Sequence, residues 1–328
     1  MRRFSFFAWV VLAYNLAVIA WGAFVRASGS GAGCGRHWPM CKGVVVPRAP
    51  SVATLIEFSH RVTSGLALLL VVGLVVAAYR GYPKGHAVRR AAGASLAFIF
   101  SEALVGAGLV LLELVAHDAS LRRAVALPAH LVNTFFLLAA LSLTAWWSTV
   151  TPRDAIGPAL RLRGQGGVGA LLGAALAGTL LLGVTGAVTA LGDTLFPAGS
   201  LAEGMRQDFA PTAHVLLRLR VWHPTLAVAV GLVVLLAAGA AWLTRDDRRT
   251  QRLALAIALL FVAQLAAGVT NLLLLAPVWM QIIHLLLADA VWITLVLLTA
   301  SAMRAGAREW GKGGGEWEED RERQVVMV

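Results

Sequence analysis

Eight long apolar stretches constrain the fold of this chain more than any other feature. Each is about 20 residues long, the length that an α-helix needs to cross the hydrocarbon core of a membrane. Because 59% of the residues are hydrophobic and only 14% are charged, most of the protein surface has to face lipid. The sequence therefore predicts an all-α integral membrane protein. Its transmembrane helices are expected at residues 6–25, 55–79, 91–112, 127–148, 168–190, 221–243, 253–275 and 279–302.

The positions of Lys and Arg predict how these helices are oriented, because short cytoplasmic loops collect basic residues. With the N-terminus inside, the inner segments hold 18 Lys and Arg residues and the outer segments hold nine. Both termini are therefore expected in the cytoplasm, with the chain in the cell membrane. Anionic lipid of the inner leaflet is a sufficient partner for the net charge of +11, and no nucleic acid is needed. We expect the polar, Gly-rich tail 305–328 to be disordered.

Two halves of the chain, residues 1–150 and 165–304, repeat one pattern. A Gly-Ala pair near the end of the first helix, at Gly22, recurs at Gly186 near the end of the fifth. The halves are expected to form two four-helix bundles with the same orientation in the membrane, whose helices cross at about 20°. Further matched positions are Glu102 with Gln264, Gly106 with Gly268, and His130 with His284.

Four histidines lie near the outward-facing starts of the even-numbered helices and form two matched pairs. They are His60 with His130 and His223 with His284. An ionisable side chain at membrane depth is costly and by default indicates function. Two neutral imidazoles from helices of one bundle suit bis-axial ligation of a heme iron, whereas zinc would need further protein ligands. Each half is thus expected to bind one heme.

The choice of His223 in the second half depends on spacing. From His60 to the matched glutamate of the third helix is 42 residues, and from His223 to the matched glutamine of the seventh helix is 41. From His214 the same interval would be 50 residues. His214 then falls in an outer segment, 205–219, that we expect to form a surface helix, and it is kept as the alternative ligand.

Charged residues near the histidines differ between the two halves. Glu57 precedes His60 by three residues and shares its helix face, whereas Arg220 takes the matching position of the second half. A carboxylate beside one heme can accept a proton or stabilise positive charge; the alternative is a structural ion pair with Arg61 at i,i+4. Arg61, Arg218 and Arg220 are predicted partners of heme propionates, with contacts to lipid headgroups as the alternative.

The only two cysteines of the chain, Cys34 and Cys41, lie in a Gly-rich loop before the second helix. The loop is expected on the oxidising side of the membrane, so these cysteines are predicted to form a disulfide. Trp38 and Pro39 suggest that the loop is a lid at the membrane interface. The sequence leaves open whether the disulfide is structural or redox-active.

Taken in order, these motifs resemble the heme A synthase family, with a likeness that covers residues 5–304. One departure from the family pattern is Pro224, which follows His223 where many members have Arg. The motifs that carry the resemblance are Gly22-Ala-x-Val-Arg26 running into the loop with Cys34-x6-Cys41 and Trp38-Pro39, then Glu57-x-x-His60-Arg61, His130-Leu131, and the second half ending in His284-Leu285.

The resemblance implies an enzyme that oxidises the C8 methyl group of heme O to the formyl group of heme A, by successive hydroxylations with water as the oxygen source. It implies that His60 and His130 face the substrate heme, that His223 and His284 ligate a heme b cofactor, and that Glu57 is the catalytic carboxylate. The expected partners are heme O, a heme O synthase and an electron acceptor that the sequence does not identify. Oligomerisation is left open.

Two other classes of protein compete with this interpretation. A bis-histidine membrane cytochrome would pass electrons between quinol and a partner protein, but it gives no reason for a carboxylate and a closed loop beside one heme only. A transporter with repeated halves would be expected to have helix breaks at mid-depth, which these apolar stretches lack. The pigments bound by the purified protein distinguish all three classes.

Overall fold

The computed structural model describes residues 2–150 and 166–303, and these residues form an all-helical protein. Eight of its helices are long and apolar enough to cross a membrane, as predicted. The predicted tail, 305–328, lies outside the described residues. The eight helices are α1 (Arg2–Ala27), α2 (Val52–Gly81), α3 (Ala87–Leu111), α4 (Leu121–Val150), α5 (Gly166–Leu195), α8 (Trp222–Thr244), α9 (Arg248–Leu273) and α10 (Val278–Ala302).

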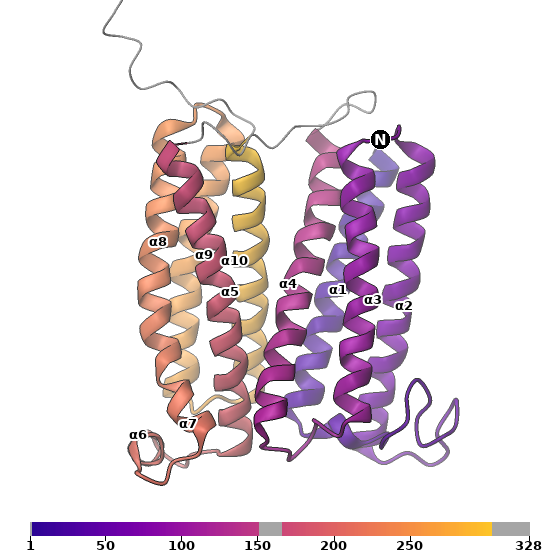
Figure 1. The fold of residues 1–328 in the computed structure, drawn as a ribbon, viewed down its shortest axis with the longest axis vertical. Helices are drawn as coiled ribbons and strands as arrows, with labels where there is room; N and C mark the ends of the chain where they lie inside the picture. The colour runs from indigo at the N-terminus through magenta and orange to yellow at the C-terminus, as the bar shows by residue number, and fades with distance from the viewer. Residues whose placement is uncertain (1, 151–165, 304–328) are drawn as a thin grey trace, which may run out of the picture.

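The helices pack as two neighbouring groups (Figure 1). Helices α1 to α4 contact one another, and so do α5, α8, α9 and α10, while α4 and α10 lie where the groups meet. There the rings of Phe135 and Trp292 stack with their centroids 5.2 Å apart, and Trp292 Nε1 donates to the Phe135 carbonyl at 2.6 Å. The grouping follows the predicted halves; the repeat that relates them stays a prediction.

The outward faces of the helices are rich in exposed apolar side chains. Leu243 is 82% exposed and Phe6 is 72% exposed, although both belong to long apolar helices. A protein in water would not leave so many large apolar side chains uncovered. The exposed apolar faces therefore agree with a multi-pass protein whose helices are surrounded by lipid.

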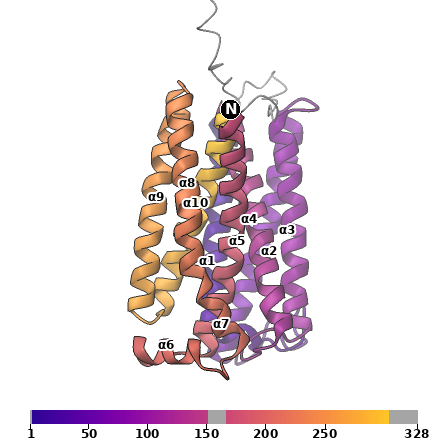
Figure 2. The same cartoon turned by 60° about the vertical axis from the view of Figure 1, so that its left-hand side comes forward.

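One end of the helix groups carries the loop with the two cysteines and two short helices, α6 (Leu201–Phe209) and α7 (Val215–Arg220) (Figures 1 and 2). The prediction of one surface helix over 205–219 is wrong, because the chain is extended at Ala210, before Pro211. A residue that precedes proline is disfavoured in helical conformation. His214 then caps α7 by accepting a hydrogen bond from the Leu216 N–H. The N-terminus of α1 lies at the opposite end (Figure 1).

Candidate functional site

Each of the four predicted histidines lies against a glycine of a neighbouring helix. A Cβ would crowd the imidazole at three of these glycines and touch it at ordinary contact distance at Gly106, so the glycines let the rings lie close to the helix backbone. An added Cβ would lie 2.9 Å from His60 Cε1 at Gly22, 3.8 Å from His130 Cε1 at Gly106, 3.1 Å from His223 Cε1 at Gly186, and 3.1 Å from His284 Cε1 at Gly268.

The histidines come together in the two predicted pairs. His60 and His130 lie close enough for a charge on one ring to act on the other, and so do His223 and His284. His214 belongs to neither pair, since it caps α7 and its ring lies 5.0 Å from the ring of Phe196. The structure thus places His223 rather than His214 near His284, and the role of His223 as a heme ligand stays a prediction.

The ring nitrogens of these pairs suit an iron whose other ligands come from a porphyrin. Among the residues that the structure describes, the buried Nδ1 atoms of His60, His130 and His284 have no hydrogen-bond partner. A buried polar atom without a partner is costly and calls for an explanation. No group of three or more His, Cys, Asp and Glu side chains in the described ranges could hold a metal ion by itself. Two buried imidazoles from different helices, with ring nitrogens that lack a protein partner, therefore fit bis-axial heme ligation.

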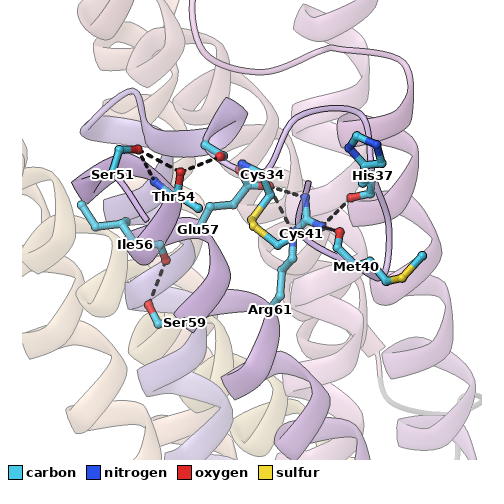
Figure 3. The surroundings of a disulfide bond; sticks show 11 residues. Cys34, His37, Met40, Cys41, Ser51, Thr54, Ile56, Glu57, Ser59 and Arg61 are labelled. Atoms are coloured by element: carbon cyan, nitrogen blue, oxygen red, sulfur yellow. Dashed lines mark hydrogen bonds and ion pairs between the residues drawn. A yellow bond between two sulfur atoms is a disulfide. The ribbon is translucent and has the colours of Figure 1, made fainter. Parts of the chain in front are cut away.

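The loop between α1 and α2 is fastened to the first turns of α2 (Figure 3). Gly33 lies directly against that helix, because a Cβ there would be 2.4 Å from the Ala53 carbonyl oxygen. The hydroxyl of Thr54 donates to the Gly33 carbonyl at 2.8 Å. Cys34 and Cys41 are both fully buried and joined by a disulfide. These contacts give the loop a defined shape. It covers the start of α2, the helix that carries His60.

Glu57 connects this loop to α2 and is only 3% exposed. Its carboxylate accepts the backbone N–H of Cys34 at 2.7 Å and pairs with the guanidinium of Arg61. Arg61 in turn donates to the carbonyls of His37 and Met40 on the far side of the loop (Figure 3). The ion pair between Glu57 and Arg61, which was the alternative role of Glu57, is therefore formed. It holds the loop against α2. The catalytic role of Glu57 stays a prediction.

We expect Cys34 and Cys41 to be oxidised in the mature protein, because both are fully buried in one loop that is expected on the oxidising side of the membrane. Alkylation of the denatured protein, followed by mass spectrometry, should label neither cysteine unless a reductant is added first. Labelling of both cysteines without reductant, in a preparation with full activity, would contradict this prediction.

Glu102 was identified from the sequence only as the position that matches Gln264, and its contact with His130 was not predicted. Its Oε1 lies 3.4 Å from Nδ1 of His130. At the matching position, the side-chain nitrogen of Gln264 lies 3.3 Å from Nε2 of His284. Each histidine pair thus has one member beside a polar residue of the preceding helix, a carboxylate in one half and an amide in the other. The signal that could have found it was the change from Glu to Gln between matched positions.

A family model described as cytochrome oxidase assembly protein matches residues 5–296. The chain belongs to this family. The match extends across both helix groups and all four histidines, so it agrees with the resemblance on which the heme interpretation depends.

Curated relatives of this family member carry two different names. A protein of Thermus thermophilus named protoheme IX farnesyltransferase is 53% identical over 314 residues, which are 95% of this chain and 51% of that protein. A heme A synthase of Bacillus mycoides is 40% identical over 111 residues, 34% of this chain and 36% of that protein. A heme A synthase of Bacillus cereus is 39% identical over the same length. The chain spans about half the length of the Thermus relatives it matches.

The three arginines predicted to bind propionates all have protein partners in this family member. Arg61 binds Glu57 and the loop, as described above. Arg220 pairs with Asp193 at 3.0 Å and with Asp208 at 2.6 Å, and Arg218 donates to the carbonyl of Pro211. Propionate binding by any of them would compete with these contacts and stays a prediction.

Arg26, at the end of α1, joins the two helix groups. It donates to the Ala190 carbonyl at 2.9 Å and to the Thr194 hydroxyl at 2.7 Å on α5, and to Gln281 Oε1 at 2.7 Å on α10. Arg26 is part of the motif at Gly22, but its partners lie more than a hundred residues away along the chain. The sequence offered no signal for this contact.

Proposed function

We propose that this protein is a heme A synthase, which oxidises the C8 methyl group of heme O to the formyl group of heme A. The observation that carries the proposal is the presence of two histidine pairs, each ring against a glycine, in which Glu57 and Glu102 of the N-terminal half are matched by Arg220 and Gln264 in the C-terminal half. Two equal sites would suit a protein that only passes electrons. A site with Glu57 and Glu102, next to one without either, suits a division between substrate and cofactor. The heme A synthases among the relatives support this assignment.

His60 and His130 would hold the substrate heme O, and His223 and His284 would hold heme b. Bound heme b supplies one-electron redox chemistry, by which electrons leave the substrate for an external acceptor. The protein's own part is to orient both groups and to keep the substrate site closed. The loop fastened by Glu57 and the disulfide closes one end of the substrate site under this proposal.

Glu57 is the proposed catalytic carboxylate. Each hydroxylation of the methyl carbon removes an electron pair and releases protons, while water supplies the oxygen atom. A carboxylate near His60 can accept one of these protons and offset the positive charge that develops on the carbon. Its contacts with Arg61 and the Cys34 N–H hold the carboxylate at a defined position.

The sides of the membrane and the partners also belong to the proposal. Both termini would lie in the cytoplasm and the histidine pairs toward the outer face, a topology that the excess of basic residues on the α1 N-terminal side supports. The Thermus relative's name describes transfer of a farnesyl group to protoheme IX. We propose that an enzyme of this kind, a heme O synthase, supplies the substrate.

Extraction and chromatography of the hemes in purified protein test the proposal. Heme b together with heme O or heme A is the expected result. Heme b alone would favour a bis-histidine cytochrome, and a protein that carries no heme would favour a transporter. Conversion of added heme O to heme A by the purified protein with a suitable oxidant completes the test.

Crowding His223 from Gly186 should weaken the binding of heme b. Gly186→Val places a branched side chain where a Cβ alone would already lie 3.1 Å from His223. Overpacking of this kind costs about 1–3 kcal/mol, so heme b affinity should fall roughly 5- to 150-fold. Gly173→Val on the same helix is the matched control, because a Cβ there meets no atom within 4 Å. Spectroscopic titration of both variants with heme b measures the effect, and equal affinities would contradict the assignment of this site.

A further inference from the structure

The carboxylate of Glu102 is held firmly beside His130. Thr134 Oγ1 donates to one of its oxygens and Asn133 Nδ2 donates to the other, both at 2.5 Å. Asn133 is itself fixed, since Ser101 Oγ donates to its Oδ1 at 2.6 Å. Because both carboxylate oxygens have donors from α4, the group cannot turn away from the histidine without breaking this network. Glu102 is therefore a preorganised charge at the substrate-side pair.

The remaining contact of this carboxylate is with the imidazole. Glu102 Oε1 lies 3.4 Å from His130 Nδ1, which is longer than a formed hydrogen bond. Both side chains are mostly buried, with 20% and 27% exposed. If Nε2 of His130 were to ligate an iron, its Nδ1 would be the nitrogen left to donate to Glu102. Histidines that ligate metals generally donate their other N–H to such a partner.

The other half has an uncharged amide at the matching position, and this amide approaches Nε2 of His284, whereas Glu102 approaches Nδ1 of His130. Gln264 occupies the place of Glu102, four residues before the glycine that faces the histidine. Its amide nitrogen lies 3.3 Å from His284, and its Oε1 is buried without a partner among the described residues. An amide can orient an imidazole but does not place a negative charge behind it. The two halves therefore differ at this position in charge and hardly in size.

We propose that Glu102 is a positioning residue that fixes His130 as a ligand of the substrate heme and lowers the reduction potential of that heme. A carboxylate behind a ligating imidazole raises the basicity of the ligand, and the added electron density favours the oxidised iron. Gln264 leaves the potential of the heme b site without this contribution. The difference favours electron flow from substrate heme to heme b, the direction that oxidation of the substrate requires. The inference rests on the proposed function for the assignment of His130 as a ligand.

Potentiometric titration of the bound hemes, followed by their separate absorption bands, tests the proposal. Glu102→Gln should raise the midpoint potential of the heme in the N-terminal site and leave that of heme b unchanged. It should also weaken binding of heme O about 10- to 100-fold, as removal of such a supporting group typically does. Glu113→Gln is the matched control, because that carboxylate lies in the same half but is 62% exposed and pairs with Arg36.

The reverse exchange keeps the proposal testable if Glu102→Gln binds no heme O. Gln264→Glu adds a carboxylate beside His284 and should lower the midpoint potential of heme b. Unchanged potentials in all heme-bound forms of both variants would overturn the role of Glu102, even if heme O is still converted to heme A. An unmutated protein that binds heme b but never heme O would instead contradict the proposed function. These potentials are measured without turnover, so the two failures are distinguishable.

Discussion

Replacement of Glu57 by Gln is expected to leave a folded protein that binds both hemes but converts heme O to heme A more slowly by a factor on the order of 100 or more. Glutamine keeps the size of the side chain and an oxygen that can accept the Cys34 N–H. It cannot accept a proton, and it carries no charge to offset the positive charge of the reacting carbon. The measurement is product formed per mole of bound substrate heme.

The contacts of Glu57 also allow a purely structural role, in which the carboxylate only holds the loop in place. Because the carboxylate fastens the loop through Cys34 and Arg61, its loss could act by loosening the loop alone. Thr54→Val is the matched control, since it removes the hydrogen bond to Gly33 and leaves the charges in place. If Thr54→Val reproduces the loss in turnover, or if Glu57→Gln turns over at a near-normal rate with reduced heme content, Glu57 is an anchor of the loop and not a catalytic residue.

The membrane helices could be predicted because a lipid environment leaves few choices for an apolar backbone. Their lengths were underestimated at several ends, where polar residues continue the helix beyond the apolar window. Helix α4 begins at Leu121, six residues before the predicted start, and its first turn includes Arg122 and Arg123. Arg123 is buried there and donates to loop carbonyls. A hydropathy pattern cannot show that a basic residue has such partners.

The histidine pairs could be predicted because their spacing along two matched halves is a property of the sequence itself. The residues that face each histidine could not be predicted in this way. The glycines against the four rings, the network that holds Glu102, and the reach of Arg26 to Gln281 all depend on how helices pack. The role of Glu57 shows the same limit, because helix spacing allowed an ion pair with Arg61 and a catalytic position equally. Only the packed loop reveals that the ion pair is formed.

The sharpest test of the second site compares two histidines nine residues apart. His223→Ala is expected to abolish the low-spin absorption of heme b, because it removes one of the two axial ligands that His223 and His284 would provide.

His214→Ala is the matched control for that variant. It should keep the spectrum, since His214 caps α7 and lies against Phe196; loss of such a cap costs about 1 kcal/mol locally. Both purified variants would be measured by absorption and electron paramagnetic resonance at equal protein concentration. A low-spin heme b signal that survives in His223→Ala and disappears in His214→Ala would reverse the ligand assignment. It would also mean that the histidine facing Gly186 is not the one that binds iron, so the glycine-lined space would no longer mark the heme site.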